Sequence, residues 1–232
     1  MGRIVAIGGG ELDTTHAINR HIVAMAGKQH PCLLFLGTAS HDSEGYIAAI
    51  HSEFEALGCT VTELCLATGT CSDDEIDRKL YQADIIYAGG GDTAFMMETW
   101  KKHGLDQKLK AVYREGRAVL SGLSAGAMCW FRCGHSDSSV LGKGDTLGYG
   151  WVNDLLDLHS YALCPHYDER VESFDEMIRE KPFPGLALEN NVAFVEQNGR
   201  ISFLATADSA KAYWIRCVDG KLEKQEQPVR VL

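Results

Sequence analysis

The sequence predicts an α/β fold in which a mostly parallel sheet carries helices on both faces and ends in antiparallel strands. Short apolar segments alternate with segments of helical periodicity through residues 3–120, a pattern typical of parallel strands buried on both sides. Gly-rich loops follow three of these apolar segments, at the strand ends where such sheets bind ligands. The last third instead contains apolar segments joined by Asn198-Gly199 and Asp219-Gly220, which favour hairpin turns.

The elements are expected in the following order along the chain. The capping box Ser72 and Glu75 indicates the start of the third helix, and Gly58 indicates the end of the second. A later helix is expected over 171–182, after a short strand over 161–164. The five predicted strands of the first half span 3–8, 31–36, 60–66, 85–88 and 118–120, and the four intervening loop-and-helix segments span 8–27, 43–58, 72–83 and 89–104.

Composition restricts the classes of function. The 232 residues contain no linker, repeat or low-complexity tract, so one domain over 1–232 is expected. A net charge of -10 argues against a nucleic-acid partner, since nucleic acids select basic surfaces. No stretch of about 18 apolar residues is present to span a membrane, and Arg3 enters a strand with no signal peptide before it.

The cysteines indicate reduced thiols in a cytoplasmic protein. None of the eight forms a C-x-x-C pair. Cys129 and Cys133 would lie one helical turn apart near His135, but this is not the spacing of a zinc site. No metal ligand is therefore expected.

The segment Gly122-Leu-Ser124-Ala-Gly126 fits a nucleophile elbow. It follows a predicted strand and precedes a segment, Ala125 to Phe131, that can open a helix, which is the context that the motif requires. The two glycines allow close backbone contacts, and the N–H of Ala125 can point at an oxyanion. The alternative is a tight turn without catalytic function.

A catalytic serine needs a base, and nine histidines are candidates. His166 is favoured because it follows a strand in the segment Cys-Pro-His-Tyr-Asp-Glu-Arg, at an element end where site residues collect. His159 and His135 are the next alternatives. His16, His21, His51 and His103 lie in helical patterns typical of surface residues, and His41 lies in a loop.

A third group should orient that base. Asp137 and Glu189 are the candidate carboxylates, both in turn-like surroundings, while Asp168 is close enough to His166 to shape its turn instead. The spacing does not choose among them.

The Gly-rich loops are not nucleotide motifs. No Lys follows Gly89-Gly90-Gly91, as a P-loop requires, and Gly8-Gly9-Gly10 lacks the G-x-G-x-x-G spacing. The second loop can instead supply a backbone N–H that faces Ser124 across the strand ends.

Four segments together resemble the peptidase E family of serine peptidases, family S51. They are YAGGGDTAFMMETW, GLSAGAMCWF, CPHYDER and GLALENNVAFV, and the likeness covers about residues 3–217. The resemblance implies a fold similar to class I glutamine amidotransferases, a flavodoxin-like three-layer α/β sandwich.

The resemblance also implies roles for individual residues. Ser124 matches the nucleophile and His166 the general base, and the acidic member matches Glu189 or Asp137, each with a small shift. Gly91 and Ala125 match the oxyanion N–H donors.

Two further residues are implied to meet the substrate. Arg170 lies where a guanidinium would bind a substrate carboxylate, with a surface salt bridge as the alternative. Asp92 stands where the family often has Asn, and it either faces the substrate or caps a helix.

The function expected from these features is a cytoplasmic serine peptidase that hydrolyses small peptides through an acyl-enzyme on Ser124. It needs no cofactor and no metal. The best-known activity of the family, release of N-terminal aspartate from dipeptides, is the finer expectation. The alternatives are cyanophycinase-like cleavage of β-aspartyl bonds, an inactive small-molecule binder of the same fold and, less favoured, a nucleotide-binding protein. A homodimer is left open.

Overall fold

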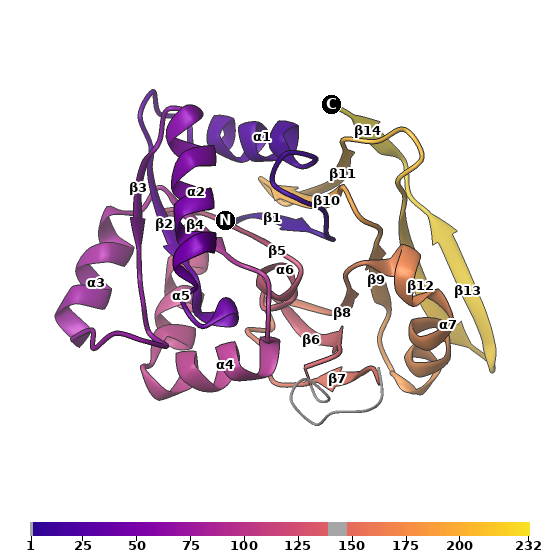
Figure 1. Ribbon diagram of the computed structural model, residues 1–232. Coiled ribbons are helices and arrows are strands. Elements are labelled where there is room, and N and C mark those ends of the chain that lie inside the picture. The colour runs from indigo at the N-terminus through magenta and orange to yellow at the C-terminus, as the bar shows by residue number, and fades with distance from the viewer. Residues whose placement is uncertain (1, 139–147) are drawn as a thin grey trace.

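The computed structural model describes residues 2–138 and 148–232 and contains helices packed on two β-sheets (Figure 1). The helices are α1 (His16–Ala26), α2 (Glu44–Ala56), α3 (Asp73–Gln82), α4 (Thr93–Lys102), α5 (Leu105–Glu115), α6 (Ala125–Met128) and α7 (Tyr167–Met177), with short 3₁₀ turns η1 (Thr38–Ser40) and η2 (Ile178–Glu180). The strands of the first sheet are β1 (Arg3–Ile7), β2 (Cys32–Leu36), β3 (Thr60–Glu63), β4 (Ile85–Ala88), β5 (Val119–Leu123), β10 (Val192–Gln197), β11 (Arg200–Ala205) and β14 (Val229–Val231). Those of the second are β6 (Phe131–Ser136), β7 (Gly150–Val152), β8 (His159–Cys164), β9 (Gly185–Leu188), β12 (Ala212–Val218) and β13 (Lys221–Glu226).

The first sheet has the order β14-β11-β10-β1-β5-β4-β2-β3. Its strands β1 to β5 are parallel, whereas β10 is antiparallel to β1 and β11 is antiparallel to β10. Alternate residues of each strand enter different apolar clusters: Ile4 packs with side chains of α3, α4 and α5, and Val5 packs with those of α1 and α2. The predicted three-layer α/β sandwich, with helices on both faces and antiparallel C-terminal strands, is therefore confirmed.

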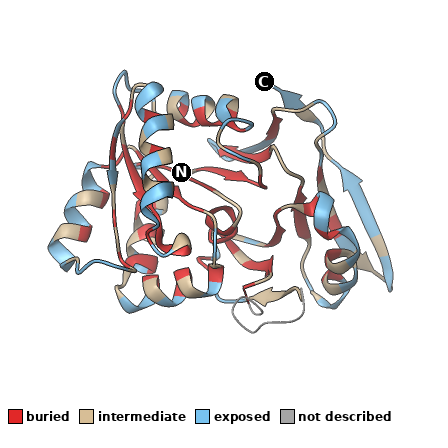
Figure 2. Cartoon of the chain, in the orientation of Figure 1, coloured by how far each residue is buried: buried red, intermediate tan, exposed pale blue. Residues whose placement is uncertain are grey.

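The second sheet was not expected from the sequence. It has the order β13-β12-β9-β8-β6-β7, and α7 packs on it through Tyr167 and Phe174. Leu163 and Leu186 of this sheet share an apolar cluster with Ile4 and with the helices α3 to α5. Figure 2 shows buried segments in strands of both sheets, and the exposed strand β13 at the outer edge of the second.

Caps and turns predicted from the sequence are confirmed at several ends of helices and strands. Ser72 caps α3, since its Oγ accepts a hydrogen bond from the Glu75 N–H at 3.2 Å. Both predicted hairpins are present. Asn198-Gly199 joins β10 to β11 and Asp219-Gly220 joins β12 to β13, and all four residues have positive φ, as two-residue hairpin turns require.

Three elements differ from the sequence prediction. Helix α5 was missed. The helix expected after Ser124 has only four residues, because the chain turns into β6, whose Phe131 and Cys133 are buried in the second sheet. Helix α7 begins at Tyr167 rather than at Val171.

A buried polar cluster that does not include Ser124 connects the two sheets. The carboxylate of Glu196 on β10 accepts hydrogen bonds from Tyr113 at 2.9 Å and from the His159 ring at 3.0 Å, and its side chain is only 6% exposed. Burial raises the pKa of Glu196, but the hydrogen bonds from His159 and Tyr113 outweigh it, so the net pKa lies below the ordinary value.

We expect Glu196→Gln to destabilise the protein by about 2 kcal/mol at pH 7, the size of a lost charge-assisted hydrogen bond. A carboxyl group with a lowered folded-state pKa stabilises the protein above its unfolded pKa and loses that contribution as pH falls through the folded value. The difference from the wild type in urea unfolding should therefore hold from pH 7 to about pH 5 and shrink as pH falls below the ordinary glutamate pKa of 4.5. Glu176→Gln, at a residue whose side chain is 82% exposed, is the control, and a difference that widens in acid would contradict the assignment.

Candidate active site

Ser124 lies in a strained turn between β5 and α6. Its φ of 55° and ψ of -112° are rare for a residue with a side chain, and its N–H donates to the carbonyl of Ile7 at 3.0 Å. A Cβ on Gly126 would lie 1.9 Å from the Ala88 carbonyl oxygen, and one on Gly122 would lie 2.4 Å from that of Gly126. Both glycines are therefore required by close packing, as expected of a nucleophile elbow.

His166 meets this serine from the second sheet. It follows β8, adopts left-handed backbone angles (φ 50°, ψ 41°) at the start of α7, and its N–H donates to the Gly8 carbonyl at 3.0 Å. Its Nε2 lies 2.9 Å from the Oγ of Ser124, which is the reach required of a base that accepts a hydroxyl proton.

The group behind the imidazole is an amide. The Nδ1 of His166 lies 2.7 Å from the Oδ1 of Asn190. The Nδ2 of Asn190 donates to Asp168 at 3.0 Å and to Glu169 at 2.7 Å. These two carboxylates turn the amide oxygen toward the ring, so Nδ1 carries the proton and Nε2 is left as the acceptor for the serine.

The two carboxylates predicted for this position lie elsewhere. Glu189 accepts a hydrogen bond from the backbone N–H of Lys211 at 2.8 Å, and a carboxylate oxygen of Asp137 lies 4.0 Å from Arg170. Neither is hydrogen bonded to His166, whose partner is Asn190. The sequence prediction is wrong by one position. Of the adjacent residues Glu189 and Asn190 after β9, only the side chain of Asn190 points toward the His166 ring.

The other two histidine candidates make different contacts. His135 is fully buried on β6 and bonds Ser173 through Nε2 at 2.9 Å, and burial together with Arg170 lowers its pKa to about 4. His159 bonds Glu196. Among the three, His166 alone contacts Ser124.

The first Gly-rich loop packs against His166 and Asn190. The Gly9 carbonyl accepts the Asn191 N–H at 2.8 Å. A Cβ on Gly9 would lie 2.1 Å from the Asn190 oxygen and 2.3 Å from the His166 Nδ1. The absence of a side chain at Gly9 therefore leaves the space in which the ring and the amide meet.

The second Gly-rich loop lies beside Ser124. A Cβ on Gly90 would be 3.5 Å from the Ser124 Cβ. Gly91 has a φ of 135°, and a Cβ there would lie 2.2 Å from the Ala39 carbonyl oxygen, so only glycine fits. The N–H groups of Gly91 and of Ala125, the first residue of α6, donate to no acceptor in residues 2–138 and 148–232. They are available to an oxyanion.

Asp92 caps a helix. Its Oδ1 accepts the Phe95 N–H at the start of α4 at 3.0 Å, which is the second of the two roles expected for this residue.

Arg170 lies one turn after His166 on α7 and is 9% exposed. It donates to the carbonyl of His135 at 3.1 Å and packs over the Tyr149 ring, with 4.9 Å from its Cζ to the ring centroid. Its Nε is buried without a partner among the described residues. Arg170 and Tyr149 line a hollow of about 570 Å³ together with Asp168 and Glu169.

The surroundings of His166 favour the neutral form of its ring. Burial, and then the positive charge of Arg170, lower the pKa of His166 below its ordinary value, although the contacts with Asn190, Glu169 and Asp168 oppose this. At neutral pH the imidazole is therefore ready to accept a proton.

No helix of the described residues is long and apolar enough to cross a membrane, and no cluster of three potential metal ligands occurs in this part of the chain.

Comparison with known protein families identifies the family of this chain. The sequence profile of Peptidase family S51 matches residues 4–204. The chain belongs to peptidase family S51. Membership supports a peptidase activity, in agreement with the resemblance seen in the sequence.

Relatives and solved structures agree with this family. The chain is 31% identical over 243 residues to the "Uncharacterized peptidase YgaJ" of Bacillus subtilis (strain 168), with full coverage of both chains. It is 35% identical over 148 residues to the "Uncharacterized peptidase Lmo0363" of Listeria monocytogenes, covering 60% of this chain and 67% of the relative.

Two crystal structures have a fold similar to that of this protein. A peptidase from an acI-B1 Actinobacterium superposes with a TM-score of 0.74 at 17% identity, over 99% of this chain and 95% of the other. A putative peptidase E protein from Listeria monocytogenes EGD-e gives a TM-score of 0.68 at 22% identity, over 89% and 100%.

We expect Gly9→Ala to lower the rate of Ser124 labelling by a fluorophosphonate about a hundredfold, because its methyl group displaces His166 and Asn190. Gly45→Ala, at a helical site with nothing within 4 Å of the added Cβ, is the matched control and should react as the wild type does. Labelling would be followed by intact-protein mass spectrometry. Equal rates in the two variants would show that the space at Gly9 does not matter to the site.

Proposed function

We propose that this peptidase is of the serine type and hydrolyses small peptides through an acyl-enzyme on Ser124. The observation that carries the proposal is the 2.9 Å contact between the Ser124 Oγ and the His166 Nε2. Asn190 holds the imidazole from behind in the tautomer that can accept a proton.

The reaction follows from these positions. His166 takes the hydroxyl proton as the Ser124 Oγ attacks the peptide carbonyl, and the N–H groups of Ala125 and Gly91 receive the oxyanion. The protonated imidazole gives its proton to the leaving amine. Water then attacks the acyl-enzyme with His166 again as base, releasing the acid and freeing Ser124.

Asn190 replaces the usual acid in this scheme. An amide oxygen orients the ring as a carboxylate does, but it carries no full charge. The charges of Asp168 and Glu169 lie one hydrogen bond further away, where they stabilise the imidazolium more weakly. Asn190 therefore orients the imidazole, and the two carboxylates hold the Asn190 amide in place.

The finer proposal is selection of dipeptides with an N-terminal aspartate, with Arg170 as partner of the aspartate carboxylate. The buried Nε without a described partner supports this role. The approach of Asp137 to within 4.0 Å opposes it, because a carboxylate already shares the guanidinium. A panel of Asp-X, Glu-X, Asn-X and Leu-X dipeptides measures the preference directly.

The test of serine-type catalysis uses a fluorophosphonate and does not require the natural substrate. The wild type should gain the mass of a single adduct, and Ser124→Ala should gain none and lose at least about a thousandfold in dipeptide hydrolysis. Ser136→Ala, at a buried serine that bonds Ser138, controls for loss of any hydroxyl. An adduct that persists in Ser124→Ala, or full turnover by that variant, would overturn the mechanism.

The pH profile tests the environment of the base. Because His166 must be neutral, kcat/KM should fall as pH drops through its pKa, with a midpoint below 6.5. Arg170→Met removes a positive charge that lowers this pKa, so the acid limb should move to higher pH. Arg179→Met, at an exposed arginine paired with Glu176, should leave the limb in place. A limb that moves to lower pH in Arg170→Met would contradict the assignment of His166.

A further inference from the structure

Strands β14, β11 and β10 form one end of the first sheet, where Arg200, Ser202 and Arg230 are exposed. Val195 and Leu204 belong to the apolar cluster of α1 and α2. In the register of the strands, Ser202 lies opposite Val195 and Arg230 lies opposite Leu204. The side chains of these four residues therefore share one face of β10, β11 and β14.

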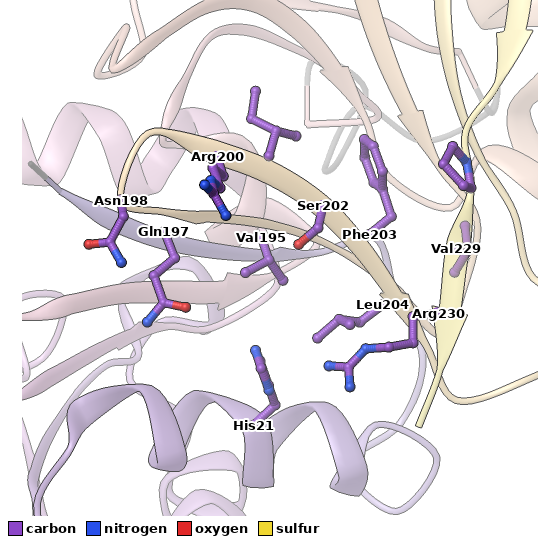
Figure 3. A pocket seen from close by; sticks show the side chains of 12 residues that line it. His21, Val195, Gln197, Asn198, Arg200, Ser202, Phe203, Leu204, Val229 and Arg230 are labelled. Carbon is purple, nitrogen blue, oxygen red and sulfur yellow. The ribbon is translucent and has the colours of Figure 1, made fainter.

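A hollow of about 930 Å³ lies over this face (Figure 3). His21 projects into it from α1, and Arg230 reaches toward His21 from β14. Val195 and Leu204 form an apolar floor, and Gln197, Asn198 and Ser202 add hydrogen-bonding groups. The site is separate from Ser124, which follows β5, three strands away from β11 in the sheet.

The charge of this hollow is opposite to that of the chain. Its lining contains the two positive charges of Arg200 and Arg230 but no Asp or Glu, although the net charge is -10. Each of four other hollows in the described residues has at least one carboxylate in its lining. No described carboxylate forms an ion pair with Arg200 or Arg230. An anion that entered would meet no repelling group in the lining.

The dimensions favour an extended ligand. Arg200 is four residues before Leu204, the residue opposite Arg230, so the two arginine positions lie roughly 13 Å apart along the strand direction. An extended peptide can present one carboxylate to each position, because its residues i and i+4 are separated by the same distance and point to the same side.

A second copy of this chain is not the favoured occupant. In a two-fold dimer on this face, the same arginines would approach one another, and like charges at an interface cost free energy. An acidic partner has the complementary charge instead.

We propose that this hollow, lined by His21, Arg200 and Arg230, is a docking site for an extended acidic peptide segment of another protein. Two carboxylates four residues apart would meet Arg200 and Arg230, and the side chain midway between them, which points to the same side, would face the floor of the hollow over the buried Val195 and Leu204. The proposal does not depend on the proposed catalytic mechanism, since it concerns binding away from Ser124.

Binding is measured by fluorescence anisotropy with the labelled, blocked peptide Glu-Ser-Val-Ser-Glu-Ser, whose single Val lies on the same side as the two Glu residues. The full chain carrying Ser124→Ala is used so that cleavage cannot interfere. Arg200→Gln and Arg230→Gln should each weaken binding about threefold, and the double variant about tenfold, as expected of exposed charge pairs. Binding should weaken as salt is raised.

The controls separate this site from general charge attraction. Arg216→Gln, which breaks an exposed pair with Glu223 on β12, should leave affinity unchanged, and the same peptide with Gln for Glu should bind at least tenfold more weakly. Melting temperatures establish that each variant is folded. Equal affinity in the double variant, or no binding at low salt, overturns the proposal. Inorganic phosphate that protects His21 from diethyl pyrocarbonate where the peptide does not would assign the hollow to a small anion instead, and would also overturn it.

Discussion

The hydrogen bond between Ser124 and His166 is the contact for which much of the structure is arranged. Its two side chains come from different sheets, Ser124 after β5 of the first and His166 after β8 of the second. Both have positive φ, so neither backbone conformation is favourable by itself. The surrounding strand ends must therefore supply the free energy that keeps the two residues in place, mainly through backbone hydrogen bonds to Ile7 and Gly8.

Glycine is the means by which these strand ends come close enough. Gly8 and Gly9 let β1 end against the loop after β9, Gly91 lies on the Ala39 carbonyl, and Gly126 packs on β4. A methyl group at any of these positions would overlap backbone or catalytic atoms. The three Gly-rich loops are thus parts of a single site, and they need no nucleotide or phosphate to explain them.

The sequence was most informative where chemistry and local geometry coincide. The elbow around Ser124 could be predicted because strand, serine and glycines form one continuous signal, and His166 because it follows a strand within a turn. The partner of His166 could not, because Glu189 and Asn190 are adjacent and a shift of one residue in an extended segment exchanges the two faces. The motif favoured the acid, whereas the structure has the amide.

The same limit explains the second sheet. Periodicity identifies a strand, as it did for β8 and the C-terminal hairpins, but it does not say which strand will be its neighbour. The assignment of β6 to β9 to a second sheet, together with β12 and β13, depends on contacts such as Cys133 with Ala162, which join residues far apart in the chain. The hollow over β11 could not be predicted from the sequence either, because Arg200, Arg230 and His21 come from three separate elements.

The division of the catalytic groups between two sheets has a consequence for the life of the chain. During synthesis the serine emerges 42 residues before its base, and Asn190 follows 24 residues after that. Even the first sheet is incomplete until β10 pairs with β1, which requires the chain to have passed β9. A nascent or partly unfolded molecule therefore has a serine of ordinary reactivity. On the proposed mechanism, the groups that would make Ser124 reactive come together only in the finished tertiary structure.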